Sequence, residues 1–455
     1  MAGDTWTDVK LSEIIDVNHG FAFSGENIRD EPPGDILLTP GNFAIGGGFK
    51  DDKFKYFDGS VPEEYILHEN DLIVTMTDLS KQADTLGYPA LVPKPKQARF
   101  LHNQRLGKVV IREGAKVDKR FLSYLLRTPR YRHEVLASAT GTTVKHTSPS
   151  RILAYKTSIP PLSEQRAIAH ILGTLDDKIE LNRRMNRTLE AIAKALYKSW
   201  FVDFDPVRAK AEGRVTGLPN AIADLFPGTF EDSELGEIPK RWEVRALGDV
   251  LSELETGGRP KGGVSSYTTG TPSIGAESIV GLGVFDYTKT KYVPDEFFKD
   301  MTRGRIKSRD VLLYKDGGRP GEFEPHVTLF GDGFPFDTCA INEHVYRMRA
   351  KEHVGQNYLF FWLASDLVME EMRIKGTGVA IPGLNSTQLK SLTMLMPTIQ
   401  VVKAFNVLVD LWITRILANC NESRTLAALR DTLLPKLISG ELRAPCARSF
   451  RKQRS

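Results

Sequence analysis

The strongest constraint on the fold is that the chain repeats one pattern twice. Trp6 and Leu11 return as Trp242 and Leu247, each 236 positions later. Other segments return in the same order, with offsets from 235 to 239 positions: residues 71–74 at 310–313, 103–110 at 342–348, 121–125 at 358–362, 141–144 at 376–379, and Asn182 at Asn419. Because 455 residues exceed one ordinary hydrophobic core, the repeat predicts two similar globular units.

Each copy begins with a region rich in glycine, proline and short apolar runs and ends in a much longer helical pattern. In the first copy, the runs at 72–76 and 108–111 resemble strands, and the Pro-Pro-Gly sequence at 32–34 indicates a turn. A helical pattern follows at 119–126. The expected fold class is therefore mixed α/β (α+β), with β-sheets in both globules.

The first long helix is expected to begin at Ser163, an N-cap residue type that follows Pro161. Its seam positions step by four and three residues, which is the heptad spacing of a coiled coil. They are Ile168, Leu172, Leu175, Ile179, Asn182, Asn186, Leu189, Ala193, Leu196 and Trp200. The second helix is expected over 400–435, with a similar stripe of Phe405, Leu408, Trp412, Leu426, Leu429 and Leu433. The alternative, that each helix only covers its own globule, requires a shorter stripe than these.

The middle of each stripe is polar. Asn182 and Asn186 in the first helix correspond to the region of Asn419 and Glu422 in the second. A buried asparagine costs stability but fixes the register of a helix pair, and antiparallel pairing brings the two polar regions together. We therefore expect two long antiparallel coiled-coil helices between two similar globules, a pseudo-two-fold axis through the polar layer, and a segment after Leu437 that returns to the first globule.

The composition is that of a soluble globular protein, with 41% hydrophobic and 26% charged residues. No stretch reaches the roughly eighteen consecutive apolar residues of a membrane span, and the polar N-terminus is no secretory signal. Three separated cysteines, at 339, 420 and 446, fit a reducing compartment. These features predict a cytoplasmic protein with no membrane partner.

The net charge of +4 is only mildly basic, so any nucleic-acid binding must rest on local clusters. Arg303, Arg305, Lys307 and Arg309 alternate with other residues, as on one face of a strand. A second basic cluster, at 448–454, belongs to a short terminal tail.

The sequence contains no recognised motif for catalysis. An adenine methyltransferase needs an Asn/Asp-Pro-Pro-aromatic motif, but the Pro-Pro at 160–161 follows Ile159, which has no amide or carboxylate. The Gly-Gly-Arg-Pro-Lys-Gly-Gly run at 257–263 lacks the spacing of a phosphate loop and fits a loop near a DNA backbone better than a nucleotide site. Histidines at 146, 326 and 344 lack paired ligand spacing. We therefore expect no catalytic residues, no metal and no cofactor.

Several segments resemble the specificity subunit of Type I restriction-modification enzymes. They are Gly-Thr-Thr-Val-Lys at 141–145, Ile-Pro-Pro-Leu-Ser-Glu-Gln-Arg at 159–166, the helix at 171–200 and Leu-Ile-Ser-Gly-Glu-Leu at 437–442. The second copy departs at 397–400, where Pro-Thr-Ile-Gln stands in place of Pro-Leu-Ser-Glu-Gln. The resemblance implies two target recognition domains, each reading half of a split sequence in double-stranded DNA. It also implies that the long helices set the spacer and bind two methyltransferase (modification) subunits, which motor-nuclease (restriction) subunits join.

On this basis, residues 1–160 form the first target recognition domain and 161–203 the first spacer helix. Residues 204–397 hold a linker and the second recognition domain, 398–440 the second spacer helix, and 441–455 a basic C-terminal tail. The expected function is DNA sequence recognition in a restriction-modification complex for phage defence, without catalysis by this chain. Two alternatives remain open: a non-catalytic scaffold whose repeated globules bind proteins, and an enzyme whose active site has no recognised motif.

Candidate DNA contacts are polar, basic or aromatic side chains on loops that can reach a groove or a phosphate. In the first globule they are Asn42, Phe43, Thr77, Asp78, Thr142, Thr143, Lys145, His146 and Ser148. In the second globule they are Ser273, Glu277, Lys315, Arg319, Arg373, Lys375 and Thr377. The alternative for each is an ordinary surface position, because base contacts are few per domain.

Overall fold

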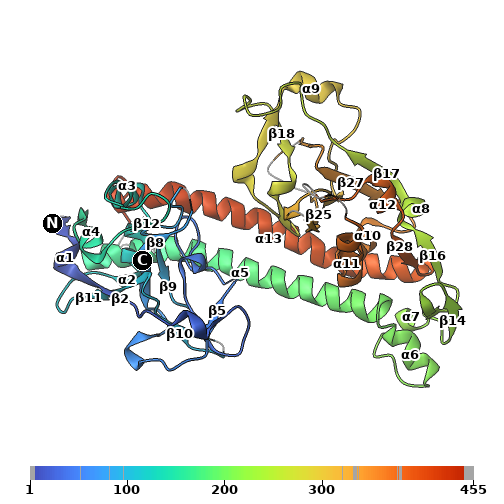
Figure 1. Cartoon of the computed structure of the whole chain (residues 1–455), viewed down its shortest axis with the longest axis horizontal. Helices are drawn as coiled ribbons and strands as arrows, with labels where there is room; N and C mark the ends of the chain where they lie inside the picture. The colour runs from blue at the N-terminus through green and yellow to red at the C-terminus, as the bar shows by residue number, and fades with distance from the viewer. Residues whose placement is uncertain are drawn as a thin grey trace, which may run out of the picture. The chain divides into compact units, whose positions relative to one another are not determined.

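The computed structural model of the chain describes residues 6–51, 53–80, 82–95, 97–319, 321–331, 336, 338–376, 378 and 382–444. The chain divides into two compact units, each of which combines helices with several small sheets (Figure 1). Unit 1 comprises residues 1–178 and 426–455, and unit 2 comprises residues 179–425. The predicted mixed α/β fold class is confirmed. No helix among the described residues has both the length and the apolar character needed to cross a membrane.

The central sheet of unit 1 is antiparallel and has the strand order β2-β11-β7-β9. Its strands are β2 (Ile15–His19), β11 (Leu106–Ile111), β7 (Leu72–Thr75) and β9 (Pro89–Leu91). The two strand-like runs of the sequence are therefore β7 and β11. All four residues of β7 are buried, which explains why its sequence is a nearly continuous apolar run rather than an alternating one.

A second sheet of unit 1 has the order β3-β5-β4-β10-β6, and in it β4 and β10 are parallel. Its strands are β3 (Ile28–Arg29), β5 (Lys55–Phe57), β4 (Asp35–Leu37), β10 (Phe100–Leu101) and β6 (Ile66–Leu67). Two further pairs are β1 (Thr7–Lys10) with β13 (Lys156–Ile159) and β8 (Thr77–Asp78) with β12 (Lys145–His146).

The short helices of unit 1 are α1 (Leu11–Ile14), α2 (Lys119–Leu125), α3 (Pro129–Ala137) and α4 (Pro149–Leu153), with 3₁₀ turns η1 (Gly25–Asn27), η2 (Pro40–Asn42) and η3 (Glu63–Tyr65). Side chains that accept backbone hydrogen bonds mark where three of them begin: Asp118 caps α2, Thr128 caps α3 and Ser148 caps α4. The helical pattern predicted at 119–126 is α2.

Unit 2 repeats the topology of these sheets. Its antiparallel central sheet has the order β17-β27-β22-β25, and its parallel pair is β18 with β26, flanked by β21. The strands are β17 (Leu251–Thr256), β27 (Val345–Ala350), β22 (Val311–Tyr314), β25 (Val327–Leu329), β18 (Thr271–Ile274), β26 (Ala340–Ile341) and β21 (Lys291–Val293). The pair of β16 (Glu243–Ala246) and β28 (Thr393–Met396) corresponds to β1 and β13. The sequence repeat is therefore also a structural repeat.

The helices α8 (Leu247–Val250), α10 (Gln356–Leu363), α11 (Asp366–Lys375) and α12 (Ser386–Lys390) stand in unit 2 where α1 to α4 stand in unit 1. Elements that precede this repeat in unit 2 are α6 (Asp205–Ala211), α7 (Asn220–Ala223), β14 (Phe230–Ser233) and β15 (Gly236–Pro239). Within it lie α9 (Asp295–Asp300), η4 (Ala276–Ser278), η5 (Tyr287–Lys289), and the pairs β19 (Ile279–Gly281) with β20 (Val284–Phe285) and β23 (Gly318–Arg319) with β24 (Glu322–Phe323).

The basic run at 303–309 does not form the expected strand face. Arg305 donates to two backbone carbonyls, Lys307 pairs with Glu253, and Arg309 pairs with Asp410. Left-handed backbone at Arg309 (φ 67°) interrupts the extended chain. Arg305, Lys307 and Arg309 therefore each have a separate partner.

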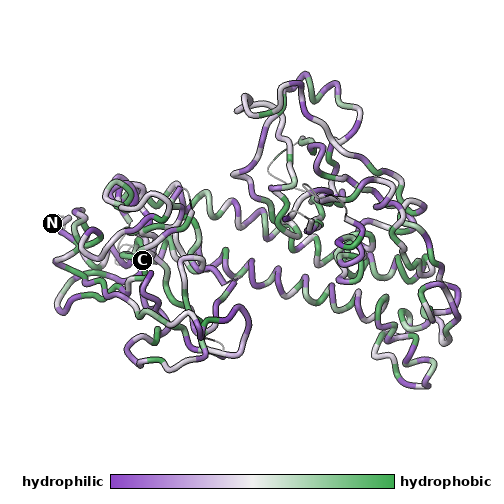
Figure 2. The backbone as a smooth tube through the Cα atoms, viewed as in Figure 1, coloured by the Kyte–Doolittle hydropathy of each residue, from purple (hydrophilic) through white to green (hydrophobic). Residues whose placement is uncertain are grey.

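Two long helices, α5 (Leu162–Phe201) and α13 (Ile399–Ser439), supply segments to both units. In each unit a segment of α5 lies beside an antiparallel segment of α13 (Figure 1). Hydrophobic and hydrophilic residues alternate along both helices in Figure 2. All ten predicted seam positions of α5 are buried or half-buried, so its heptad pattern corresponds to a packed face.

Two details of the helix predictions are wrong. The helix α5 begins at Leu162, and the carbonyl of Pro161 accepts two amides of the first turn, so Ser163 lies inside that turn and does not cap it. In α13, Leu429 is 46% exposed. The buried face runs instead through Ile413, Cys420, Ala427 and Leu434, which are spaced by seven residues and are buried or half-buried, so the predicted stripe of Trp412, Leu426 and Leu433 lies one residue away from it.

The last residues of α13 and the segment that follows it pack in unit 1, as the antiparallel pairing of the long helices predicts. Leu437, Ile438 and Ala444 are buried in the core of unit 1. Arg443 donates from Nε and Nη2 to the two carboxylate oxygens of Glu164, at 2.7 and 2.8 Å. Unit 1 is therefore built from two stretches of chain that are far apart in sequence.

Candidate nucleic-acid interface

Several loops of unit 1 meet at one edge of its central sheet. Strands β2 and β7 end and β11 begins at this edge, because Gly107 pairs with both His19 and Val74. The loops approach so closely that one position requires glycine: a Cβ atom on Gly20 would lie 2.2 Å from the carbonyl oxygen of Asn103. The loops after β2, after β7 and before β11 are therefore held together.

Four predicted contact residues of unit 1 lie on a single strand pair near this edge. Thr77 and Asp78 form β8, and Lys145 and His146 form β12. Thr77 Oγ1 and His146 Nδ1 are 3.2 Å apart. His146 is exposed and Lys145 is half-buried, whereas Thr77 and Asp78 are buried. The structure thus brings the four residues together but leaves only the β12 pair accessible.

Asp78 holds the loop that follows β8. Its carboxylate accepts the amide of Ser80 at 2.6 Å and the hydroxyl of Thr85 at 2.6 Å. Burial raises the pKa of Asp78, but the hydrogen bonds from Thr85 and Ser80 outweigh burial and leave the pKa below its usual value. The ionised side chain is used inside the loop and is not presented to a ligand.

The turn before β12 presents two of the predicted threonines. Thr142 and Thr143 are exposed, and the turn requires Gly141 (φ 94°), because a Cβ atom there would lie 1.9 Å from the carbonyl oxygen of Val144. Ser148 is half-buried and caps α4. The accessible polar surface of this segment is therefore formed by residues 142–146.

Asn42 and Phe43 face the interior of unit 1. Asn42 is 1% exposed, and its side chain accepts the amide of Thr39 at 2.9 Å and donates to the carbonyl of Lys53 at 2.8 Å. Phe43 is buried in an aromatic cluster that includes Phe100. These two residues shape the loop from within, and the sequence offered no sign of their inward orientation.

The equivalent edge of unit 2 contains a pocket of about 310 Å³. Here β22 ends and β27 begins, because Tyr314 pairs with Val345. As in unit 1, a glycine allows the close approach: a Cβ atom on Gly257 would lie 1.5 Å from the carbonyl oxygen of Ile341. The pocket is lined by Ala276, Glu277, Tyr314, Asp316, Gly317, Gly318, His344 and Pro382.

The polar walls of this pocket are fixed by ion pairs. Asp316 Oδ1 is 2.7 Å from His344 Nδ1, and Asp316 Oδ2 is 2.5 Å from Lys315 Nζ. Glu277 pairs with Lys291. Burial raises the pKa of Glu277, but the Lys291 hydrogen bond and charge outweigh it, so the pKa lies below its usual value and the carboxylate is ionised.

The other predicted residues of unit 2 are dispersed. Ser273 is buried within β18, and Arg319 is exposed on β23. Arg373 and Lys375, on α11, pair with glutamates of the preceding turn at 3.0 and 2.8 Å. Thr377 lies outside the described residues. Of this group, Arg319 is exposed and has no ion pair among those of the described residues.

Sequence reasoning missed Asp316 and His344, although the repeat held a signal for both. Asp316 occupies the position of Thr77, two residues after the equivalent strand, and His344 occupies that of Arg105, directly before β11. Comparing the two copies loop by loop indicates both positions. Their contact with each other depends on loop conformation, which the sequence does not display.

The polar layer of the long helices is closely hydrogen-bonded within unit 2. Asn419 Nδ2 donates to Asn186 Oδ1 at 2.8 Å. Asn182 Nδ2 lies 2.8 Å from Glu422 Oε2 and 3.3 Å from Ser423 Oγ. The four predicted residues thus face one another across α5 and α13, in the antiparallel arrangement.

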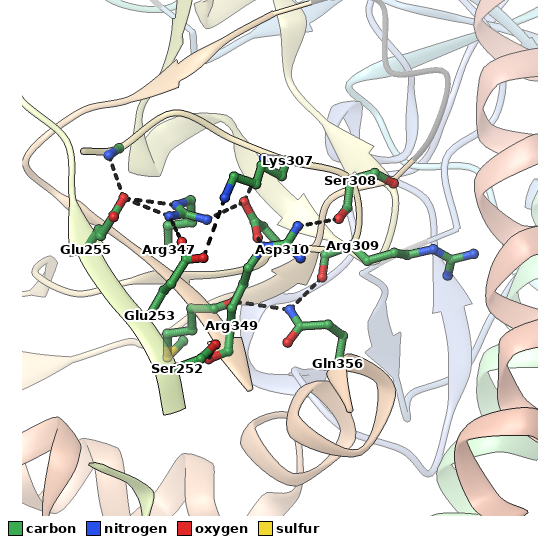
Figure 3. Close-up of polar contacts among 12 residues, drawn as sticks. Ser252, Glu253, Glu255, Lys307, Ser308, Arg309, Asp310, Arg347, Arg349 and Gln356 are labelled. Carbon is green, nitrogen blue, oxygen red and sulfur yellow. Dashed lines mark hydrogen bonds and ion pairs between the residues drawn. The ribbon is translucent and has the colours of Figure 1, made fainter. Parts of the chain in front are cut away.

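A buried charge network links three strands of the central sheet of unit 2 (Figure 3). Arg347 on β27 is 2% exposed and contacts Glu253 and Glu255 on β17, the latter at 2.8 Å, and Asp310 at 3.0 Å. Arg349 contacts the same aspartate at 2.6 Å. Burial raises the pKa of Asp310 despite these partners, whereas the hydrogen bond from Arg347 lowers the pKa of Glu253. The network orders the strands that carry the edge loops.

Residues 3–191 match the family described as the Type I restriction modification DNA specificity domain. The match covers the N-terminal part of unit 1 and continues along α5. The chain is similar to the specificity subunits of type I restriction-modification enzymes.

Relatives of this family match most of the chain. It is 24% identical over 359 residues to the type I restriction enzyme MjaIX specificity subunit of Methanocaldococcus jannaschii, covering 79% of this chain and 76% of that protein. It is 22% identical over 463 residues to the type I restriction enzyme EcoBI specificity subunit of Escherichia coli, covering 97% and 87%. The crystal structure of a Type-I restriction-modification system S subunit from M. genitalium matches with a TM-score of 0.53 at 16% identity, over 96% of this chain and 97% of that one. This structural likeness shows a shared fold.

Proposed function

We propose that this chain is the sequence-reading subunit of a type I restriction-modification complex and binds a bipartite DNA target, one half per unit. The observation that carries the proposal is the structural repeat: β2-β11-β7-β9 and β17-β27-β22-β25 have the same order and direction. Each places a group of loops at the same sheet edge. Two equivalent reading edges suit a target made of two separate half-sites.

The long helices set the unspecified spacer between the half-sites in this proposal. Asn182, Asn186, Asn419 and Glu422 fix the register of α5 against α13, because the buried Asn182 and Asn419 side chains reach their hydrogen-bond partners on the other helix only in one alignment. Residues 1–160 and 204–397 then contain the two recognition domains, with spacer helices at 161–203 and 398–440 and the basic tail at 441–455.

The proposed partners are double-stranded DNA, two modification subunits and the restriction subunits. The accessible residues of the reading edges are Thr142, Thr143, Lys145 and His146 in unit 1, and Glu277, Lys315 and Arg319 in unit 2. They offer hydroxyl, cationic and carboxylate groups, which suit contacts with phosphates and base edges. Catalysis is assigned to the partner subunits in this proposal, and this chain contributes recognition and assembly.

The test is to express the chain with a cognate modification subunit in a host that lacks the system, and to map methylated adenines by long-read sequencing. We expect one new motif in two parts, separated by a fixed number of unspecified bases. A continuous motif would leave DNA recognition in place but contradict one half-site per unit. No new methylation, with the partner shown to be bound, favours the protein-interaction scaffold instead.

A matched control uses a chain truncated to unit 2, residues 179–425, under the same conditions. Because this chain lacks the first reading edge, we expect no two-part motif from it. A full two-part motif from residues 179–425 alone would contradict the assignment of one half-site to unit 1.

A further inference from the structure

We infer that the pocket at the reading edge of unit 2 accepts a base that presents an exocyclic amino group in the major groove, namely cytosine or adenine. Glu277 supplies the acceptor, and Asp316 with His344 forms the opposite wall. This inference rests on the proposed function and adds to it the chemical class of base read at one position of the second half-site.

The walls of the pocket come from three loops whose positions are fixed by backbone contacts. Glu277 lies on η4, directly after the parallel strand β18. The loop after β22 is joined to the loop before α12, since Gly317 N donates to the carbonyl of Pro382 at 2.8 Å. His344 N donates to Asn342 Oδ1 at 3.0 Å in the loop before β27. The pocket is thus formed before any ligand binds, as most ligand sites are.

The floor of the pocket is bare backbone. Gly317 (φ 148°) and Gly318 (φ 121°) adopt conformations that side chains disfavour. A Cβ atom on Gly317 would lie 1.6 Å from the hydroxyl of Tyr314. Glycine at this position therefore lets the Tyr314 hydroxyl lie against the backbone, and a larger residue would displace the tyrosine ring that lines the pocket.

The charges around the pocket are balanced. Glu277 pairs with Lys291, Asp316 with Lys315, and Glu343 of the adjacent loop with Arg259 at 2.9 Å. Three carboxylates next to a polyanion would otherwise oppose binding. With a cation beside each carboxylate, the cations can face phosphates while the carboxylates accept hydrogen bonds from a base.

The acceptor chemistry selects the base. An ionised carboxylate only accepts hydrogen bonds and has about four acceptor positions, more than its contact with Lys291 uses. The amino groups of cytosine N4 and adenine N6 donate in the major groove, whereas guanine O6 and thymine O4 accept. Glu277 therefore favours cytosine or adenine and disfavours guanine and thymine at the position it faces.

Unit 1 does not present the same chemistry at its edge. Asn42, on the turn η2 that corresponds to η4, is 1% exposed. Thr77, which corresponds to Asp316, carries a hydroxyl and is 7% exposed, and the neighbouring Asp78 is 3% exposed and is occupied by Ser80 and Thr85. The carboxylate-lined reading position is therefore assigned to the second half-site alone.

The first experiment compares the methylated motifs of the complex with wild-type chain, with Glu277→Gln and with the control Glu296→Gln, an exposed carboxylate on α9. Glutamine keeps the shape but both donates and accepts, so we expect guanine or thymine to be admitted at one position that was cytosine or adenine. The other half-site, and the motif of the control, stay unchanged. An unchanged motif with Glu277→Gln overturns the inference.

The second experiment measures binding of the wild-type complex to its target duplex, in which single cytosines are replaced by 2-pyrimidinone and single adenines by purine, each lacking the amino group. We expect one position of one half-site to weaken binding by about ten- to a hundred-fold, and Glu277→Gln to abolish most of this difference. The same replacement in the spacer is the control for duplex stability. No sensitive position, or the same sensitivity in Glu277→Gln, overturns the inference.

These experiments separate failure of the inference from failure of the proposed function. If the wild-type complex produces no two-part motif, the proposed function fails and the inference falls with it. If the two-part motif appears but no base depends on Glu277, the proposed function stands and only the assignment of this pocket is wrong.

Discussion

The two units share one topology but are held together by different chemistry. In unit 2 the central sheet carries the Arg347 network with three carboxylates. At the same place in unit 1, Lys108 pairs with Asp71 at 2.7 Å. The topology therefore does not depend on these particular contacts, because the strand pattern and turn positions specify it in both copies.

The contacts between the long helices also differ between the two units, but here the charge contact is in unit 1. In unit 1, Asp176 joins α5 to Arg430 of α13 at 2.7 Å and to Arg127 of α2 at 3.0 Å. In unit 2, Tyr197 of α5 packs against Phe405 of α13, with ring centroids 5.9 Å apart, within a large aromatic core. In addition to apolar packing, the helices of unit 1 are joined by a charge contact, whereas those of unit 2 are joined by aromatic packing and the Asn182–Glu422 layer. This difference predicts different responses to mutation and pH.

The largest effect is expected from shortening one long helix. Deleting residues 183–189 from α5 preserves the heptad phase but removes Asn186 and misaligns the rest of the seam with α13. We expect loss of methylation at the wild-type motif, and its return with a different spacer when the equivalent residues 420–426 are also deleted. The measurement is the methylated motif of each variant. A single deletion that keeps the original spacer and activity would contradict the spacer role of the helices.

A smaller effect separates the two central sheets. Arg347→Met leaves three carboxylates without their shared buried cation and is expected to lower the free energy of unfolding by about 3–5 kcal/mol. Lys108→Met in unit 1 breaks one partly solvated pair, with an expected loss of about 1 kcal/mol. Urea unfolding of both variants tests the difference. Equal losses would show that the network contributes no more than one pair.

The pH dependence of stability should differ between two buried aspartates. Burial raises the pKa of Asp176, but Arg127 and Arg430 outweigh burial and lower the pKa below 3.8. The contribution of ionised Asp176 to the free energy of unfolding is therefore present above pH 3.8 and is lost as the pH falls through the folded-state pKa. Burial raises the pKa of Asp310, so the pH dependence is reversed. The contribution of protonated Asp310 to the free energy of unfolding is complete below pH 3.8 and is lost as the pH rises through the folded-state pKa.

Urea midpoints between pH 3 and 6 test this contrast. As the pH falls from 6 to 3, the stability advantage of wild type over Asp176→Asn should shrink. Over the same range, the stability of wild type relative to Asp310→Asn should increase. Parallel pH profiles for the two variants would contradict the assigned directions.

The smallest effect concerns the segment after α13. Arg443→Ala removes two hydrogen bonds from Glu164, which is itself buried, and is expected to cost about 1–2 kcal/mol in the local stability of residues 437–444. Arg245→Ala, which removes an exposed pair with Glu243, is the control and should have little effect. Hydrogen exchange of the segment measures both. Unchanged protection in Arg443→Ala would show that apolar packing alone holds it.

Much of the architecture was predictable because it follows from periodicity. The repeat predicted two similar units, the run at 72–76 became β7, and the α5 seam is buried or half-buried at every predicted position. The start of α5 was placed one residue late because serine is a common N-cap residue, whereas Ser163 lies inside the first turn. Leu429 was assigned to a buried stripe because the apolar residues of α13 fit two neighbouring heptad phases, and the spacing alone does not show which phase faces a partner.

The candidate site was less predictable because it consists of loops. Asparagine is a residue type that often contacts bases, but the inward hydrogen bonds of Asn42 depend on a turn that no periodic pattern displays. The contact between Asp316 and His344 joins two loops 28 residues apart in sequence. Periodic patterns report burial, whereas loop contacts depend on which residues the completed sheets place opposite each other.

The packing of residues 437–444 against unit 1 has a consequence for synthesis of the chain. Unit 2 is continuous in sequence, so all of its residues have emerged before α13 is finished. Unit 1 lacks Leu437, Ile438 and Ala444 from its core until these residues, which follow all of unit 2, have left the ribosome. Although domains generally fold from the N-terminus onward, the first unit to begin here is the last to be completed, and a chain that stops early leaves it open.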